Sequence, residues 1–216
     1  MNLVIFDLDG TLIDSKLDLV HSVNATRALM EMPALSEHDV ASYVGSGAPV
    51  LIRRVLGPSA SEAEVERALA YFLSYYREHM LDNTHLYAGV KNALDRMLEA
   101  GTKMAVLTNK PVRFSRSLVQ GLGLEGHFFQ IYGGNSFEQK KPHPIGIETL
   151  LQEAGASRER TMMVGDSGVA VRTARNANVK ACGVTYGFQP EGFLEDPPDI
   201  LVDSLSQLAD YVLQFG

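Results

Sequence analysis

Two aspartates stand directly after the first apolar run of the chain, in the segment Phe6-Asp7-Leu8-Asp9-Gly10. Alternate residues of an extended segment share a face, so Asp7 and Asp9 can point into one site, and Gly10 permits the sharp turn that such a site needs. Two carboxylates this close resist being ionised together, so one is expected to bind a metal or act as a nucleophile while the other carries a proton. An acidic loop without a chemical role is the competing interpretation of this segment alone.

Polar residues at the ends of three further apolar segments favour the chemical interpretation. Thr108 and Asn109 offer a hydroxyl and an amide that can hold phosphate oxygens, and Lys141 supplies a point charge for them. Asp166 adds a third carboxylate, a hard oxygen ligand that suits Mg²⁺. Because ligands of open α/β sheets bind outside the carboxyl ends of the strands, these groups together predict one shared site.

The apolar pattern predicts the elements that position these residues. Short apolar runs occupy residues 3–6, 104–107, 129–132, 161–164, 181–185 and 200–202. They lack in/out alternation, which is typical of strands buried on both faces of a parallel sheet. Amphipathic stretches between them end at glycines such as Gly101 and Gly155, which are good helix C-cap residues. The order predicts an α/β fold, a Rossmann-like doubly wound parallel sheet.

One region interrupts this alternation with helical patterns and no convincing strand. Val65, Leu69, Phe72 and Tyr76 keep spacings of three or four residues there. We therefore expect a Rossmann-like core over residues 1–13 and 87–216 and a separate small helical domain over residues 14–86. The aromatic residues of this segment, Tyr76 included, are interpreted as packing within the helical bundle.

Composition limits the partners and the location. The chain has 26 acidic and 19 basic residues and a formal net charge of -7, which disfavours nucleic acid and anionic membrane surfaces as partners. The single cysteine, Cys182, excludes an intramolecular disulfide and favours a reducing compartment. No apolar run of about 18 residues could span a bilayer, and the N-terminus lacks the features of a signal peptide. A cytoplasmic protein is expected.

Four segments resemble the four motifs of the haloacid dehalogenase superfamily, in order and at fitting separations. They are Asp7-Leu8-Asp9-Gly10-Thr11, Thr108-Asn109, Lys141-Pro142 and Gly165-Asp166-Ser167. Further segments are similar to the phosphoglycolate phosphatase branch of that superfamily, among them Thr108-Asn109-Lys110-Pro111, Gly133-Gly134-Asn135-Ser136 and Lys141-Pro142-His143-Pro144. The resemblance runs along essentially the whole chain.

The resemblance implies a Mg²⁺-dependent phosphatase acting on a small phosphorylated substrate, with 2-phosphoglycolate favoured. Asp7 would be the nucleophile that forms an aspartyl-phosphate, and Asp9 would protonate the leaving alkoxide and then activate water. Mg²⁺ would sit on the Asp7 carboxylate, the Asp9 backbone carbonyl and Asp166, because an anionic nucleophile must approach an anionic phosphate.

The remaining assignments concern the substrate. Thr11, Thr108, Asn109 and Lys141 would hold the substrate and its phosphoryl oxygens. The helical insertion fits the cap of this superfamily's α-helical cap type, and its Gly45-Ser46-Gly47 segment is the candidate loop for substrate selection. Gly45 and Gly47 would let backbone N–H groups approach a small carboxylate; an ordinary interhelical turn is the alternative. Arg53 could assist as a cation, although a surface arginine is the simpler interpretation.

One position departs from the family pattern. The fourth motif usually carries a second acid four residues after the first, and Ala170 occupies that place here. The loss of this carboxylate should weaken metal binding, since groups of this kind typically contribute about 10–100-fold in affinity or activity. A catalytically weakened relative that binds a phosphorylated ligand or a protein partner is therefore one alternative. A phosphatase for a sugar phosphate or pyrophosphate is the other.

Overall fold

The computed structural model describes residues 1–214, and residues 215–216 of the expected core lie outside the described part. Its centre is a six-stranded sheet with the order β5-β4-β1-β6-β7-β8, in which every pair of neighbours is parallel. The strands are β1 (Leu3–Phe6), β4 (Lys103–Leu107), β5 (Gln130–Tyr132), β6 (Thr161–Gly165), β7 (Lys180–Val184) and β8 (Ile200–Val202). They fall on the six apolar runs, so the predicted doubly wound α/β fold is confirmed.

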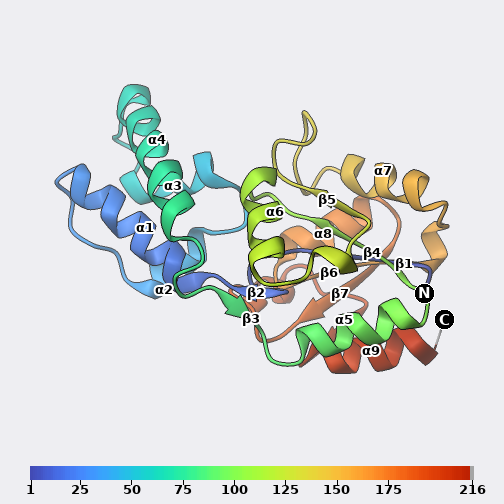
Figure 1. Ribbon diagram of the computed structural model, residues 1–216. Coiled ribbons are helices and arrows are strands. Elements are labelled where there is room, and N and C mark those ends of the chain that lie inside the picture. The colour runs from blue at the N-terminus through green and yellow to red at the C-terminus, as the bar shows by residue number, and fades with distance from the viewer. Residues whose placement is uncertain (215–216) are drawn as a thin grey trace.

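Side chains of the central strand β1 alternate between two apolar layers, and this explains why its run shows no polar positions. Val4 and Phe6 pack in one buried cluster together with α5 (Val90–Glu99), α6 (Val112–Gly121) and α9 (Leu205–Gln214). Leu3 and Ile5 pack in a second cluster with α7 (Ile145–Ala154) and α8 (Gly168–Asn176). Figure 1 shows α5 and α9 side by side below the sheet and α7 above it. Burial on both faces fixes the sheet as the rigid base of the site.

Four helices follow β1 in the chain and lie to one side of the sheet (Figure 1). They are α1 (Lys16–Leu29), α2 (Glu37–Tyr43), α3 (Ala48–Leu56) and α4 (Glu62–His79). The start of α4 is set by its local sequence, because Ser61 and Glu64 form a reciprocal capping box there. The division of the chain into two domains at residues 14 and 86 stays a prediction.

Two connecting segments of the chain join these helices to the sheet. Residues Ile13–Asp14 (β2) and His85–Leu86 (β3) pair as two short antiparallel strands. Sequence analysis found no strand here, because two residues are too few to show a periodicity. Beside them Asp18, which is 1% exposed, accepts hydrogen bonds from the backbone N–H groups and side chains of Asn83 and Thr84. These hydrogen bonds link the segment after β2 to the segment before β3.

Short 3₁₀ helices complete the chain at η1 (Glu125–His127), η2 (Arg158–Arg160) and η3 (Pro190–Leu194). Among residues 1–214, no helix combines the length and the apolar character needed to cross a membrane.

Candidate active site

The first motif lies in a tight turn at the carboxyl end of β1, at the centre of the sheet. The Asp7 N–H donates to the Val164 carbonyl (2.9 Å) and so extends the pairing of β1 with β6 by one residue. The chain then turns, with the Leu12 N–H donating to the Leu8 carbonyl at 2.9 Å. Gly10 has a φ of +75°, and a Cβ at this position would lie 2.0 Å from the Asp166 Oδ2. Only glycine therefore lets the two motifs approach.

Asp7 is paired with the lysine that the sequence placed in the same site. The Nζ of Lys141 lies 2.6 Å from the Asp7 Oδ2, and the Lys141 side chain is 2% exposed. The alignment of this ion pair is not that of a hydrogen bond, and the Nζ has no hydrogen-bond partner within residues 1–214. A buried ammonium whose N–H groups lack hydrogen-bond acceptors costs free energy unless a further acceptor binds it. The oxygens of a phosphoryl group on Asp7 would be such acceptors.

Asn109 is placed in the site, but its side-chain amide is already used. Its Nδ2 donates to the carbonyls of Lys141 (3.0 Å) and Gly45 (2.9 Å), and its Oδ1 accepts from the Lys141 N–H (3.0 Å). Both amide hydrogens are thus committed to backbone carbonyls. Asn109 positions Lys141 and holds Gly45, whereas the sequence assigned it to phosphate oxygens.

The two other predicted phosphate-binding residues differ in position. Thr108 lines the pocket, and its Oγ1 accepts from the Lys110 N–H (3.2 Å), which leaves its O–H free to donate. Thr11 is fully buried and is not among the described residues that line the pocket. Its Oγ1 has no hydrogen-bond partner within the described chain, and its carbonyl accepts from the Tyr186 hydroxyl.

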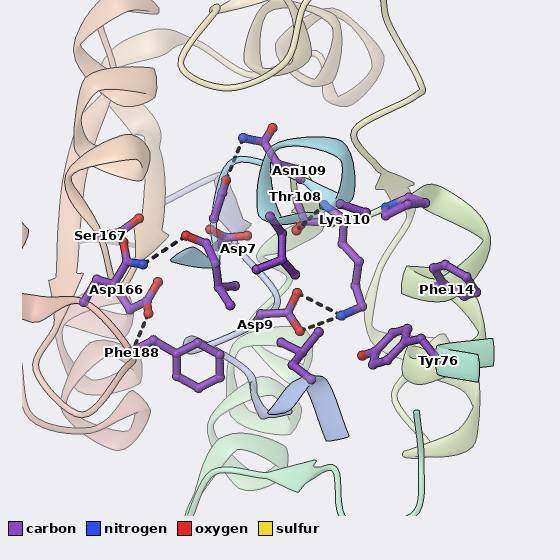
Figure 2. A pocket seen from close by; sticks show the side chains of 18 of the residues that line it. Asp7, Asp9, Tyr76, Thr108, Asn109, Lys110, Phe114, Asp166, Ser167 and Phe188 are labelled. Carbon is purple, nitrogen blue, oxygen red and sulfur yellow. Dashed lines mark hydrogen bonds and ion pairs between the residues drawn. The ribbon is translucent and has the colours of Figure 1, made fainter. Parts of the chain in front are cut away.

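Asp166 is held in a strongly unfavourable place for a negative charge. It is 4% exposed, and its Oδ2 accepts a hydrogen bond from the Phe188 N–H (2.7 Å). Burial, together with the neighbouring Asp7 carboxylate, raises the pKa of Asp166 from 3.8 to about 7. Figure 2 shows Asp166 and Phe188 on one side of the pocket and Asp9 with Lys110 on the other.

The donor chemistry around Asp7 and Asp166 fits a hard divalent cation. Burial and the neighbouring Asp7 carboxylate disfavour the charged form of Asp166, and a bound cation would offset that cost. Within residues 1–214 no three His, Cys, Asp or Glu side chains are grouped so that they could hold a metal ion. The Asp9 carboxylate is turned toward Lys110, and the contribution of its backbone carbonyl to a metal site stays a prediction.

Asp9 is held by a cation that sequence analysis did not assign to the site. The Lys110 Nζ donates to both carboxylate oxygens of Asp9, at 2.9 and 3.1 Å, and the Ser15 hydroxyl donates to Oδ1. The same Nζ lies 4.5 Å from the centre of the Tyr76 ring on α4. Burial lowers the pKa of Lys110, but the Asp9 charge and Tyr76 outweigh it, and the net direction is upward.

Tyr76 was expected to serve packing only, and this interpretation was incomplete. Its ring does stack on Phe72, but it also lines the pocket and covers Lys110 (Figure 2). Burial raises the pKa of Tyr76 to about 12. The available signal was its spacing: Tyr76 follows Phe72 by one helical turn, so both face the same side of α4.

The Gly45–Gly47 loop lines the pocket from the side of the helical segment. Gly45 and Gly47 have φ values of +106° and +89°, which favour glycine at both positions. Gln189, a residue that sequence analysis did not select, donates from its Nε2 to the carbonyls of Ala41 (2.9 Å), Ser42 (3.0 Å) and Val44 (2.9 Å). Gln189 thus binds the end of α2 just before the loop, and Asn109 binds the loop at the Gly45 carbonyl.

Two further residues lie outside the pocket's described lining. Arg53 forms an ion pair with Glu62 and also donates to the Ala60 carbonyl, so it contacts the beginning of α4. Ala170 is 2% exposed, and its Cβ would lie 2.3 Å from a Cβ built on Gly165. The position where the family's second acid is expected is therefore close-packed against the end of β6.

The fold is a parallel α/β sheet, and a candidate aspartate nucleophile lies at the end of its central strand. This combination is the one expected of the haloacid dehalogenase-like hydrolases. The sequence profile of the haloacid dehalogenase-like hydrolases matches residues 4–184, and the chain belongs to this family. It is 36% identical to a phosphoglycolate phosphatase of Vibrio vulnificus (strain CMCP6) over 220 residues, covering 99% of this chain and 96% of the relative. A phosphoglycolate phosphatase of Pseudomonas putida (strain KT2440) is 39% identical over 215 residues, covering 95% and 78%.

Solved structures agree with these relatives. A protein from Haemophilus somnus 129pt, described as a predicted phosphoglycolate phosphatase, superposes with a TM-score of 0.93 at 30% sequence identity, covering 98% of this chain and 97% of its own. The chain is thus an enzyme, a phosphoric monoester hydrolase of the haloacid dehalogenase-like family.

Proposed function

We propose that the protein hydrolyses 2-phosphoglycolate to glycolate and phosphate through an aspartyl-phosphate intermediate, with Mg²⁺ as its cofactor. The observation that carries the proposal is the pairing of Asp7, at the carboxyl end of the sheet, with the buried Nζ of Lys141, which has no hydrogen-bond partner among residues 1–214. The relatives named above supply the substrate, since their names specify phosphoglycolate.

The reaction would proceed in two displacements at phosphorus. A carboxylate oxygen of Asp7 forms a bond to phosphorus while the bond from phosphorus to the ester oxygen breaks, and Asp9 gives its proton to the departing alkoxide. In the second displacement Asp9 accepts a proton from water, the water oxygen bonds to phosphorus, and the bond to Asp7 breaks. Free phosphate leaves and Asp7 is regenerated.

The other residues would act on charge and position. Lys141 and the Thr108 hydroxyl would bind phosphoryl oxygens as negative charge redistributes over them. Asp7, Asp166 and the Asp9 carbonyl would hold Mg²⁺, which when bound would offset the repulsion between the anionic nucleophile and the anionic phosphate. Thr11 stays a proposed phosphate-binding residue, supported by its hydroxyl, which lacks a hydrogen-bond partner in the described part of the chain.

We also propose that residues 14–86 form a cap over a core made of residues 1–13 and 87–216. The lining of the pocket supports this, because it combines residues from both parts: Leu19, Val44, Leu51, Phe72, Leu73 and Tyr76 from the first, and Asp7, Asp9, Thr108, Lys110, Asp166 and Phe188 from the second. Apolar walls would exclude bulk water from the reacting groups. The cytoplasm remains the proposed location, on the ground of the single cysteine.

The apolar walls of the pocket disfavour a sugar as the leaving group. Leucine and phenylalanine side chains of the helical segment cannot pair the several hydroxyls of a sugar phosphate, and an unpaired buried hydroxyl is costly. Ala170 favours the other alternative, a weakened relative that binds without useful turnover, because the usual acid is missing.

A panel of phosphate esters, assayed while Mg²⁺ is titrated, tests these statements. We expect turnover of 2-phosphoglycolate above that of sugar phosphates and pyrophosphate, and Asp7→Asn should abolish it while the fold is kept. Asp210→Asn, at an exposed aspartate on α9, is the matched control and should retain full activity. No turnover of any ester at saturating Mg²⁺ would refute the phosphatase, and preference for a sugar phosphate would refute the substrate.

A further inference from the structure

The pocket of the candidate site contains three acidic side chains and a single cationic one within the described residues. Asp7, Asp9 and Asp166 line it, and Lys110 is the one lysine or arginine in that lining. Lys141 reaches Asp7 from outside the lining, and Arg53 is turned toward Glu62. Lys141 and the proposed Mg²⁺ are assigned to the phosphoryl group, so among the side chains of this lining Lys110 is the cation left for a second negative charge on the leaving group.

Lys110 is fixed rigidly in its position. Its side chain is 6% exposed, its Nζ contacts both oxygens of Asp9, and the Tyr76 ring covers it at 4.5 Å. A surface lysine must lose about 2 kcal/mol of side-chain entropy when it binds a ligand, whereas a buried and braced lysine has already lost it. Lys110 is thus preorganised as a point charge in the lining of the pocket.

The distance between Lys110 and the reacting oxygen follows from Asp9. To protonate the leaving alkoxide, Asp9 must come within about 3 Å of the ester oxygen. Lys110 is itself within 3.1 Å of both Asp9 oxygens. A carboxylate on the neighbouring carbon has its carbon atom two covalent bonds, or about 2.5 Å, from the ester oxygen, since each bond is about 1.5 Å, and its oxygens lie one bond further. Such a group can therefore contact Lys110 while the ester oxygen contacts Asp9.

We propose that Lys110 is a specificity-determining residue, which binds a carboxylate carried on the carbon next to the ester oxygen of the substrate's leaving alcohol. The proposal rests on the proposed function, because it uses Asp9 as the group that reaches the ester oxygen. It identifies the substrate class as phosphate esters of small 2-hydroxy acids, and it assigns to the core a role in selection that sequence analysis gave to the Gly45–Gly47 loop.

Substrate pairs that differ only in this carboxylate give the first test. Ethyl phosphate has the size of 2-phosphoglycolate, with a methyl group where the acid has its carboxylate. Wild-type enzyme should prefer 2-phosphoglycolate in kcat/KM, and Lys110→Met should reduce that preference by about 10–100-fold, the usual worth of a hydrogen bond to a charged group. Both substrates should lose some activity through Asp9, so the ratio of the two kcat/KM values is the readout.

Matched variants separate charge from packing. Lys110→Gln keeps a hydrogen-bonding side chain without the charge and should behave as Lys110→Met does, and it replaces that variant if the methionine fails to fold. Lys110→Arg keeps the charge and should restore part of the preference. Lys16, whose Nζ lies 5.2 Å from the Phe188 ring, is the control: Lys16→Met should leave the ratio within about twofold. An unchanged ratio in Lys110→Gln would overturn the proposal.

Lys140 is the rival cation and provides a second way to refute the proposal. Its Nζ would lie 3.3 Å from a Cβ built on Gly47, but Lys140 is not part of the described lining. Lys140→Met could lose the preference for 2-phosphoglycolate over ethyl phosphate while Lys110→Met keeps it. That result would place the carboxylate site at the Gly45–Gly47 loop instead. We expect the opposite result.

Binding measured without turnover distinguishes failure of this inference from failure of the proposed function. In an Asp7→Asn background, calorimetry should show tighter binding of 2-phosphoglycolate than of ethyl phosphate, and Lys110→Gln should remove the difference. If wild-type protein hydrolyses no ester but this difference is present, the phosphatase is wrong and the carboxylate site stands. If 2-phosphoglycolate is hydrolysed and the difference persists without Lys110, the carboxylate site is wrong and the phosphatase stands.

Discussion

Asp166 is expected to destabilise the metal-free protein at neutral and alkaline pH, and Asp166→Asn should therefore stabilise it. The pKa of this carboxyl rises from 3.8 to about 7 because of burial and the Asp7 charge. A carboxyl with a raised pKa favours the folded state at pH values below its pKa in the unfolded chain. This contribution to stability is lost as the pH rises through about 7, the pKa in the folded state. The full difference corresponds to about 4 kcal/mol.

The expected difference between variant and wild type grows with pH. From pH 5 to pH 8, the gain in unfolding free energy of Asp166→Asn over wild type should increase by about 3 kcal/mol, because asparagine carries no charge to bury. The asparagine Oδ1 can still accept the hydrogen bond from the Phe188 N–H, so packing changes little. Asp210→Asn, at an exposed ion pair with Arg96, should change stability by less than about 0.5 kcal/mol at either pH.

Urea unfolding followed by circular dichroism, with a chelator present and at both pH values, measures this difference. A gain that is the same at pH 5 and pH 8 would refute the argument that a buried charge is the cause. Mg²⁺ gives a second readout: it should raise the melting temperature of the wild type by binding the folded state, and this shift should be lost in Asp166→Asn. An equal shift in both proteins would remove Asp166 from the metal site.

Three further substitutions test other parts of the structure. Ala170→Asp should tighten apparent Mg²⁺ affinity about 10–100-fold in a titration of activity. It should also lower the stability of the metal-free protein, because the position is 2% exposed. Unchanged affinity would mean that this position does not act on the metal. Gln189→Ala should raise KM several-fold with a smaller effect on kcat, because it frees the carbonyls at the end of α2 that precede the Gly45–Gly47 loop. Equal KM values would show that these hydrogen bonds are dispensable. Asp18→Ala should cost about 2–4 kcal/mol of unfolding free energy, since the N–H groups of Asn83 and of the buried Thr84 lose a charged acceptor; a loss below about 1 kcal/mol would contradict that account.

The sheet and the placement of its polar ends were predictable because both depend on local sequence. A strand buried on two faces needs a continuous apolar run, and the run at residues 3–6 meets that need on its own. Parallel strands bring their carboxyl ends to one edge, so Asp7, Thr108 and Asp166 could be placed together from their positions after three strands.

The alternation argument for Asp7 and Asp9 succeeded only in part. Both line one pocket, but β1 ends at Phe6, and the turn from Leu8 to Leu12 gives Asp9 a direction of its own. Its carboxylate meets Lys110, which lies 101 residues further along the chain. A rule for extended backbone does not hold through a hydrogen-bonded turn, and no local pattern shows which distant side chain will meet it.

Sequence by itself determined the family, the sheet and the positions of the candidate acids at the ends of its strands, because motif order and apolar periodicity are properties of short segments. Only the tertiary structure decided how the side chains divide their work. It committed the Asn109 amide to Lys141 and Gly45, gave Asp9 its lysine, and brought Tyr76 of α4 over that lysine. Each of these contacts joins segments that are far apart in the chain, so each is fixed by how the helices pack on the sheet rather than by the residues on either side.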